Sequence, residues 1–368
     1  NVRSRRQRQM CIRDRIENLN IFSVNNDYFK DYSNNSSLVY GFEYTFNNVN
    51  SKAYLQSYKS TISGLALSNQ YFNIPTRYPS DEGHYSTAAI YSEYRKDLSK
   101  KSNINFGMRF TDTRLRAKWN DTNIINASIS DVHSQNSSIT SSFGYVLRTK
   151  NNWKKSANFS SGFRSPNIDD IGKIREHKGV LSVPNSKLKP EYAYSSEIGL
   201  YKSSLNKQNI FSINAYYTHI SKHITRDYFE IKDDTSTSDP STIVFNSEEV
   251  ITMANVNKGN AYIYGSTLDI KLSSPNLWTL KGNLTFTHGG SVNSRHPLPS
   301  ISPLFGNFSL RYMVTKSSDL ELSYKFSSSK NPEKYSIGGE DGLEETPLVF
   351  DGIDFSYNGM PSWNICLL

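Results

Sequence analysis

Polar and apolar side chains alternate along one segment of the chain after another. In residues 320–327, LELSYKFS, every second side chain is apolar and those between are polar or charged. Successive side chains of a β-strand point to opposite faces, so a period of two predicts strands with one apolar and one polar face. The same alternation recurs in 152–164, 261–272, 277–290 and 303–315.

The whole chain, followed in this way, predicts roughly 13 or 14 strands. They are expected near 16–30, 36–48, 84–98, 102–117, 135–149, 152–164, 191–204, 208–221, 243–256, 261–274, 277–290, 303–315, 317–329 and 347–357. Many are longer than the roughly 9 to 11 residues that cross a bilayer. We therefore expect them to project beyond it.

The predicted connections alternate in length. Short turns are expected at 99–102, 149–152, 205–207, 273–276 and 315–318, and long loops at about 49–83, 118–134, 165–190, 290–302 and 330–346. Short turns at one end and long loops at the other are typical of outer-membrane barrels. The pattern predicts an all-β fold, an antiparallel transmembrane β-barrel.

Composition agrees with a barrel. Mean hydropathy is -0.59, because in a wide barrel only every second strand residue meets lipid. Aromatic residues make up 13% of the chain, which favours strands. Those near strand ends suit either interfacial girdles or cross-strand packing, and the pattern leaves both open. They are Tyr85, Tyr91, Tyr94, Trp119, Trp153, Tyr216, Tyr217 and Trp278.

The net charge of +8 comes mainly from the first residues. Residues 1–15 hold six Arg and one Asp, a local +5, and show neither strand nor helix periodicity. We expect them to be a non-native or disordered tail, with a basic arm for nucleic acid or anionic lipid as the less favoured alternative. Residues 16–368 form the barrel portion, and no nucleic-acid partner is expected. The two cysteines, Cys11 and Cys366, make a disulfide framework or thiolate metal site implausible.

Two boxes flank a loop in the middle of the chain. The first is Gly162-Phe163-Arg164-Ser165-Pro166, and the second is Pro184-Asn185-Ser186-Lys187-Leu188-Lys189-Pro190-Glu191, followed by Ser195, Glu197 and Gly199. This pair resembles the signature of TonB-dependent outer-membrane receptors. Residues 257–261, 297–303 and 359–363 resemble further elements of that family.

The resemblance implies a receptor in the Gram-negative outer membrane that takes up a bulky nutrient, such as a ferric siderophore or haem. It implies energy from a TonB-ExbB-ExbD complex acting through a plug that we expect to lie outside this sequence, together with a signal peptide and the first and last strands. The chain would then be an incomplete barrel of about 13–14 strands from an expected 22. A passive porin or surface adhesin barrel is the alternative.

Arg164 and His177 are the candidate ligand-binding residues. Arg164 follows the polar face of its strand, so it is expected in the lumen, where it could bind an anion, contact the plug or, as the favoured alternative, pair with Glu191 or Glu197. His177 lies between the boxes, where some haem receptors of this family carry a haem-binding His. A solvated loop histidine is the favoured alternative. No permanent cofactor is expected, only haem or an iron chelate as transported ligand.

No catalytic or metal site is expected. The sequence lacks a Gly-x-Ser-x-Gly elbow, a His-Glu-x-x-His motif and a Gly-rich phosphate loop. Asp169 and Asp170 are adjacent on a loop, where such residues more often cap a short element than act as an acid/base pair. Acidic residues at 233–239 and 340–345 invite a calcium interpretation, with solvated loop charge favoured. We therefore expect a transport receptor rather than an enzyme.

Overall fold

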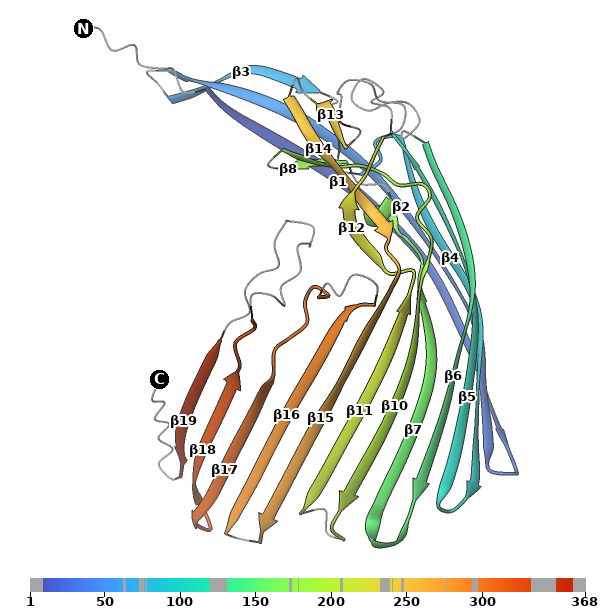
Figure 1. The fold of residues 1–368 in the computed structure, drawn as a ribbon, viewed down its shortest axis with the longest axis vertical. Helices are drawn as coiled ribbons and strands as arrows, with labels where there is room; N and C mark the ends of the chain where they lie inside the picture. The colour runs from blue at the N-terminus through green and yellow to red at the C-terminus, as the bar shows by residue number, and fades with distance from the viewer. Residues whose placement is uncertain are drawn as a thin grey trace, which may run out of the picture.

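Long antiparallel strands lie side by side in one curved sheet in the computed structural model (Figure 1). The structure describes residues 9–61, 64–72, 76, 78–119, 131–171, 174–177, 179–205, 208–231, 239, 241–245, 248–275, 277–292, 297–331 and 349–359. Along the path of this sheet each strand pairs with the next strand of the path, and the described elements that come between two such strands in the sequence lie in their connecting loop. The predicted all-β, antiparallel architecture is confirmed.

Thirteen strands form the path of this sheet, and a further strand is attached to one of them. In order they are β1 (Gln9–Tyr32), β2 (Ser36–Thr61), β4 (Glu82–Ser99), β5 (Ser102–Lys118), β6 (Asp131–Arg148), β7 (Trp153–Arg164), β10 (Glu191–Ser203), β11 (Ile210–Ser221), β15 (Asn260–Ser274), β16 (Trp278–Ser291), β17 (Phe305–Thr315), β18 (Ser318–Ser327) and β19 (Phe350–Asn358). β3 (Gly64–Phe72) pairs with the far end of β2.

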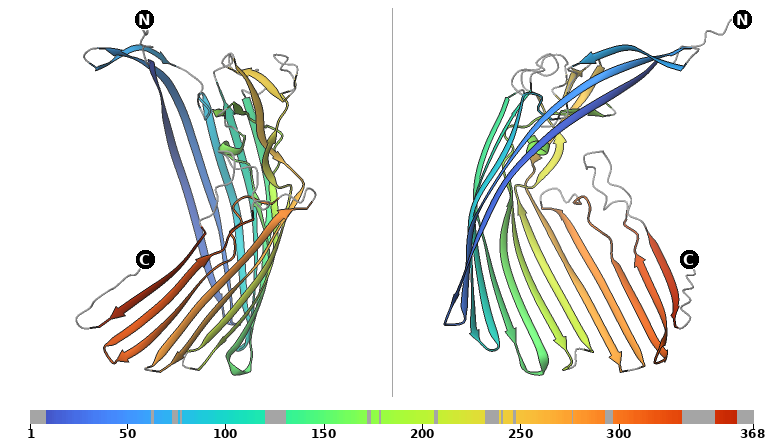
Figure 2. Two further views of the ribbon diagram at one scale, coloured as in Figure 1. Left: turned by 60° about the vertical axis from the view of Figure 1, so that its left-hand side comes forward. Right: turned by 180° about the vertical axis from the view of Figure 1, so that it is seen from behind.

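The sheet bends but does not close, and β1 and β19 are its two edges (Figure 2). The turns β4–β5, β6–β7, β10–β11, β15–β16 and β17–β18 lie together at the lower edge in Figure 1, and the longer connections lie at the opposite end. The predicted segregation of short turns from long loops is therefore confirmed. We call the loop-bearing end the rim.

The two faces of the sheet differ as the alternation predicts. On β10, Tyr194, Ile198 and Leu200 are exposed on one face, and Ile198 pairs with Ala157 of β7 and Ala215 of β11, which continue the apolar face on both neighbouring strands. On β5, Leu115 and Ala117 point to the other face and are buried beneath the loops at the rim. The exposed apolar face is therefore the outward face, and the face beneath the loops is the lumenal face.

Aromatic rings contact one another across strands on the outward face. Tyr264 lies 5.2 Å from His288 and 6.1 Å from Phe286 between ring centroids. Near the opposite end, Trp153 meets Phe211 edge to face at 6.4 Å. Trp153 is therefore compatible with both sequence-based interpretations. Trp119 is buried in the cluster on the lumenal face of β5, so the girdle interpretation was wrong for that residue.

Tyrosines opposite glycines tie together three strands of the lumenal face. Tyr216 of β11 lies across from Gly265 of β15, and its hydroxyl reaches Thr287 of β16 at 3.0 Å between oxygens. Tyr91 of β4 lies in the same way across Gly41 of β2 and donates a hydrogen bond to Asp27 of β1. A side chain at either glycine would occupy the space of the tyrosine hydroxyl.

A second, five-stranded sheet is built from the loops at the rim. It consists of β8 (Arg175–His177), β9 (Val180–Ser182), β12 (Ile224–Tyr228), β13 (Thr242–Phe245) and β14 (Glu248–Asn257). Its own core contains Leu181, Ile243, Phe245 and Val250. A neighbouring cluster joins Ile224 and the loop residues Ile171 and Leu188 to the lumenal face of β5 and β6, so the loop sheet is anchored on the inside of the wall.

The expected wall strand at 243–256 was wrong, because these residues form β13 and β14 of the loop sheet. Ile243, Phe245, Val250, Thr252 and Ala254 are buried and alternate with more exposed positions. A period of two therefore occurs both in strands that cover a core with one face and in strands that face lipid with one face.

The expected loop at 49–83 was also wrong in part. β2 continues to Thr61 and β3 returns beside it. The asparagines at 47–50 argue against a strand by propensity, yet they are paired on the ladder with both β1 and, at 47 and 48, β4. Strand pairing here overrides local preference.

Gln9–Arg15 of the expected tail lie in β1 and pair with β2. Residues 1–8 and the predicted family element from 360 to 363 lie outside the described residues, as do the acidic positions 233, 234 and 340–345. The part of the chain that the structure describes contains no helix long and apolar enough to cross a membrane.

Candidate functional site

The two sequence boxes meet at the rim. Gly162, Phe163 and Arg164 end β7 and pair with Ala193, Tyr192 and Glu191 at the start of β10. Pro166 is fully buried just beyond the end of β7, and Pro190 is buried directly before the start of β10. Proline lacks an amide donor and so suits a strand end. The loop between the two boxes therefore leaves the wall at the end of β7 and returns to it at the start of β10.

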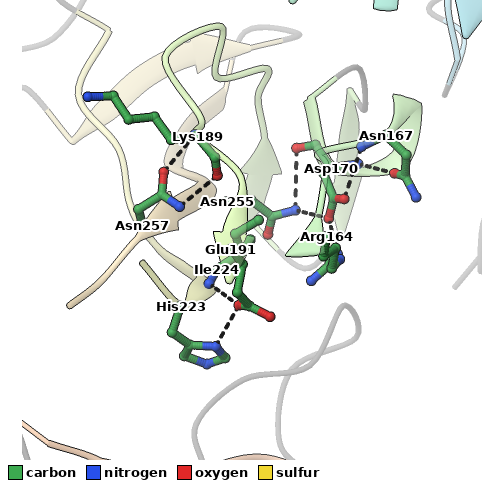
Figure 3. A network of polar contacts seen from close by, with 9 residues as sticks. All are labelled: Arg164, Asn167, Asp170, Lys189, Glu191, His223, Ile224, Asn255 and Asn257. Atoms are coloured by element: carbon green, nitrogen blue, oxygen red, sulfur yellow. Dashed lines mark hydrogen bonds and ion pairs between the residues drawn. The ribbon is translucent and has the colours of Figure 1, made fainter. Parts of the chain in front are cut away.

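Arg164 forms an ion pair with Asp170 (Figure 3). The Arg164 side chain is half exposed, whereas 6% of the Asp170 side chain is exposed. The ion pair predicted with Glu191 or Glu197 was wrong, because the chain turns back through a short helix, α1 (Ile168–Ile171), and brings Asp170 to the arginine. The Asp170 carboxylate, which caps α1, thus contacts Arg164 in place of the Glu191 carboxylate on the neighbouring strand.

Asp170 is held by the helix that carries it. Asn167 Oδ1 accepts a hydrogen bond from Asp170 N at 2.9 Å, and Asp170 Oδ2 accepts one from Asn167 N at 3.2 Å. This reciprocal arrangement is a capping box. The expectation that the acidic pair caps a short element is confirmed for Asp170. Burial raises the pKa of the Asp170 carboxyl, although the Arg164 guanidinium opposes that change.

The second box fastens the loop to β14. The Asn185 side-chain amide donates to the Asn255 carbonyl at 2.8 Å. Lys189 N donates to Asn257 Oδ1 at 2.8 Å, and Asn257 Nδ2 donates in return to the Lys189 carbonyl at 2.8 Å. Leu188 is buried in the cluster beside β5. In this structure these box residues make contacts within the fold.

Glu191 holds the next corner of the rim. One carboxylate oxygen, Oε2, lies 2.9 Å from His223 Nδ1 and accepts a hydrogen bond from Ile224 N at 2.6 Å (Figure 3). Lys222, before the histidine, has a φ of 56°, which suits a sharp reversal between β11 and β12. Glu191 therefore fixes the direction in which the chain enters the loop sheet.

We call these contacts the rim network, which comprises Arg164, Asn167, Asp170, Lys189, Glu191, His223, Asn255 and Asn257. Asp170 connects the end of β7 with β14. It contacts Arg164 of β7, and it accepts a hydrogen bond from the Asn255 side-chain amide of β14 at 3.3 Å. Sequence reasoning did not assign a role to Asn255 or Asn257. The Asn-x-x-Asp spacing of 167–170 was the available signal for the cap.

A small cavity lies beside the rim network. Its lining includes Asp170, Ser182, Arg226 and Asn255, and its volume is about 30 Å³. That is close to the share of liquid volume of one water molecule. The cavity is too small for a nutrient, so we assign it to the interior packing of the loops.

His177 ends β8, and its backbone pairs with Val180 of β9. The second candidate ligand residue thus belongs to the loop sheet, on a hairpin of the same loop that carries the two boxes. Its predicted role toward haem stays a prediction. In the described part of the chain, no group of three or more His, Cys, Asp or Glu side chains could hold a metal ion.

The lumenal wall is polar and internally paired. Arg109 of β5 contacts Glu43 of β2 at 3.1 Å between nitrogen and oxygen and lies over the Tyr91 ring. Arg311 of β17 contacts Asp319 of β18 at 2.6 Å. A polar inner wall beneath folded loops, with an apolar outer face, is the arrangement found in the wall of a membrane β-barrel.

Comparison with known families gives the same result. The model of the family described as "TonB dependent receptor-like, beta-barrel" matches residues 3–346. The chain therefore belongs to this family. The proteins of similar structure are transport receptors rather than enzymes, and the predicted family resemblance is confirmed.

Individual relatives carry different cargoes. The chain is 26% identical over 198 residues to "Hemoglobin and hemoglobin-haptoglobin-binding protein A" of Haemophilus influenzae, covering 52% of the chain and 18% of that protein. The "Copper transporter OprC" has a TM-score of 0.67 at 13% identity, covering 94% of the chain and 49% of the transporter. The "FrpB iron transporter" of Neisseria meningitidis has a TM-score of 0.61 at 13% identity, covering 93% and 48%. The chain thus spans about half the length of these solved structures.

Proposed function

We propose that this chain forms the wall and part of the outer vestibule of an outer-membrane receptor that imports a bulky nutrient, such as a ferric siderophore or haem. The observation that carries the proposal is the loop sheet anchored on the lumenal face of β5 and β6, because it places folded loops at the mouth of a polar lumen. The family membership supports a transport receptor.

The rim network serves this function by holding the mouth in one arrangement. Asp170 and Glu191 each connect the end of a wall strand with a segment of the loop sheet. A receptor must present preorganised loops to recognise a large ligand without a high ordering cost. The boxes at 162–166 and 184–191 thus shape the vestibule, and Arg164 takes part through Asp170.

Energy for uptake would come from a TonB-ExbB-ExbD complex acting on a plug inside the barrel. The polar lumenal wall, with pairs such as Arg109–Glu43, supports this proposal because a removable plug needs a hydrated, hydrogen-bonding contact surface. A passive porin would need an open lumen, whereas a surface adhesin would need no passage through the lumen. Neither accounts for the membership in a family of transport receptors.

Haem is the cargo with the most specific support. The Haemophilus influenzae relative is named for binding haemoglobin and haemoglobin–haptoglobin, and His177 lies on a hairpin of the loop between the boxes. Imidazole is a common axial ligand of haem iron. In this version His177 contributes directly to haem capture at the mouth.

Growth on defined iron sources tests the proposal. The receptor, produced in full from its own gene, would be expressed in a Gram-negative host that lacks its own iron receptors, with haem, haemoglobin or a ferric siderophore as the only iron source. We expect growth on one of them that is lost when the host TonB is deleted. Growth that persists without TonB would support a porin, and no growth on any bulky iron source would contradict the proposal.

The haem version has a separate test. We expect purified receptor to shift the haem Soret absorbance and His177→Ala to abolish that shift, with His133→Ala as a control, because His133 lies on β6, away from that hairpin. An unchanged spectrum with His177→Ala would exclude His177 as the haem ligand while leaving siderophore uptake standing.

A further inference from the structure

Two ladders of the wall end well below the rim, although strands of each continue beyond them. The β6–β7 ladder ends at the pair Ser142–Ser160, whereas β6 and β7 both extend further toward the rim. The β16–β17 ladder ends at the pair Thr285–Phe305, whereas β16 extends to Ser291. Among the described residues, no ladder joins these strands above those pairs. The described wall therefore has two splits that open toward the rim.

The strands between the two splits form one continuous part of the wall. We call β7, β10, β11, β15 and β16, together with the loops that follow them at the rim, the middle panel. Its ladders run up to the rim, where Arg164 pairs with Glu191 and Ala261 pairs with Ser291. The loop sheet and the rim network both belong to loops of this panel. One unit of the wall therefore carries these folded loops of the vestibule.

The loop after β16 also packs on the middle panel. Leu298 and Ile301 of this loop join a cluster with Ile220 of β11 and Ala261 of β15. On this side, β15 and β16 rise above β17, β18 and β19 (Figure 1). The two shortened ladders cover seven and eight residues from the short-turn end, so the splits begin at nearly the same height. Two such points on either side of a panel define an axis about which it can tilt.

A side chain closes the start of the first split. Ser161 of β7 follows the last ladder pair and lies beside Ser141 of β6. The Ser161 hydroxyl accepts a hydrogen bond from Ser141 N at 2.8 Å and donates one to the Ser141 carbonyl at 3.3 Å. These bonds satisfy backbone groups that lipid would leave without a partner. Because the hydroxyl belongs to a side chain, they can break without disturbing the ladder below.

Side chains also join the middle panel to its neighbours on the lumenal face of the first split. Thr113 of β5 and Ser165, directly after β7, lie 2.7 Å apart between hydroxyl oxygens. The Tyr78 hydroxyl donates a hydrogen bond to Asp169 of α1 at 2.8 Å. Ile171 of α1 packs in the cluster with β5 and β6. Apolar contacts are non-directional, so this joint can separate while every backbone ladder stays intact.

We propose that the middle panel tilts as one body about the axis between the two splits, and that this movement widens the mouth when a bulky nutrient enters. The inference rests on the transport function proposed above. The loop sheet and the rim network move with the strands that carry them, so the vestibule keeps its internal contacts while the mouth opens. The contacts that must break are the side-chain contacts across the first split, chiefly those of Ser161 and Ser165.

Distances between spin labels test the movement without any transport. The receptor, produced in full from its own gene with its native cysteines replaced by serine, would be labelled at Ser137→Cys of β6 and Glu248→Cys of β14, across the first split. The control pair, Ser221→Cys and Glu248→Cys, lies within the middle panel. Pulsed electron paramagnetic resonance in lipid vesicles should give two distance populations across the split and one within the panel. One population in both pairs would overturn the proposal, and so would two in both, because the loop sheet would then move alone.

A disulfide across the split tests whether uptake needs the movement. Thr113→Cys/Ser165→Cys would lock the middle panel to β5, because the two side chains already touch. Ser195→Cys/Thr218→Cys is the matched control, since these hydroxyls lie 3.0 Å apart on neighbouring strands within the panel.

Haem is the transport probe, and labelling of free thiols confirms that each disulfide has formed. We expect the oxidised lock to lose haem uptake and a reducing agent to restore it, whereas the control imports haem in both states. Full uptake by the oxidised, crosslinked lock would overturn the proposal. A wild-type receptor that imports no haem would count against the haem version of the transport function, and the spin-label distances would still decide whether the panel tilts.

Discussion

Arg164 and Glu191 lie directly opposite each other where β7 meets β10, yet the side chain of each makes its polar contact with another residue. Arg164 contacts Asp170, and Glu191 contacts His223. Two neighbouring wall strands are thus connected to two different loops. The charges at the rim therefore couple the wall to the vestibule rather than one strand to the next.

Removing the Asp170 carboxylate should loosen the vestibule. Asp170→Ala leaves Arg164, the Asn167 amide and the Asn255 side chain without their common acceptor, and we expect a local loss of roughly 1–3 kcal/mol. Hydrogen exchange of α1 and β9 measures it. The control is Asp354→Ala, because the Asp354 contact with Lys325 is exposed and 3.7 Å long. Equal exchange in wild type and Asp170→Ala would show that the rim network does not hold the loop.

The loop should also respond to pH through Asp170. Burial raises the pKa of this carboxyl in the folded protein, so between its ordinary and its raised pKa the folded state binds more protons than the unfolded chain. The free energy of opening the loop should therefore fall as the pH rises through that window. Asp170→Asn cannot titrate and should lose this dependence. Hydrogen exchange of β9 across a pH series compares the two proteins, and parallel curves would refute the assignment.

Gly265 should not tolerate even a methyl group. A Cβ there would lie 2.4 Å from the Phe286 carbonyl oxygen and 2.6 Å from the Tyr216 hydroxyl oxygen. We expect Gly265→Ala to break the Tyr216–Thr287 hydrogen bond and to cost roughly 1–3 kcal/mol. Gly162→Ala is the matched control, because a Cβ at Gly162 meets nothing within 4 Å. Urea unfolding of both variants measures this cost. Similar unfolding midpoints for Gly265→Ala and Gly162→Ala would contradict the close approach of Tyr216 and the Phe286 carbonyl to Gly265.

Neighbouring residues of β10 should respond oppositely to the same substitution. Ile198 is 64% exposed on the outward face, and Glu197 belongs to the lumenal face. We expect Ile198→Lys to destabilise the inserted protein by roughly 2–4 kcal/mol near the bilayer midplane, and Glu197→Lys to cost much less. Reversible unfolding from lipid vesicles measures both. A larger cost for Glu197→Lys would mean that the faces are assigned the wrong way round.

Much of the wall followed from the sequence because alternation and turn length are local signals. The spacing of residues such as Leu320 and Leu322 predicts both that the segment is a strand and which of its side chains share the apolar face. The strand at 243–256 was misplaced for the same reason, since Ile243 and Phe245 alternate as lipid-facing residues do but face a loop core. Only tertiary pairing separates the two cases.

The candidate site was predictable only in part. The boxes located the rim, because proline and the adjacent charged residues mark where β7 ends and β10 begins. The partner of Arg164 did not follow, because α1 returns Asp170 to the arginine over a turn of a few residues. Asn255 and Asn257 reach the second box from about 70 residues away along the chain, and no local pattern encodes such a contact.

The parallel pairing of β14 with β9 joins two loops that are far apart in sequence. Val180 pairs with Ile251, and Ser182 pairs with Met253, across the whole of β10 and β11. Neither loop can therefore be exchanged alone without leaving a broken ladder in the other. A chimera with a related receptor should fold its vestibule only when both segments come from the same parent, and their natural variants should be inherited together.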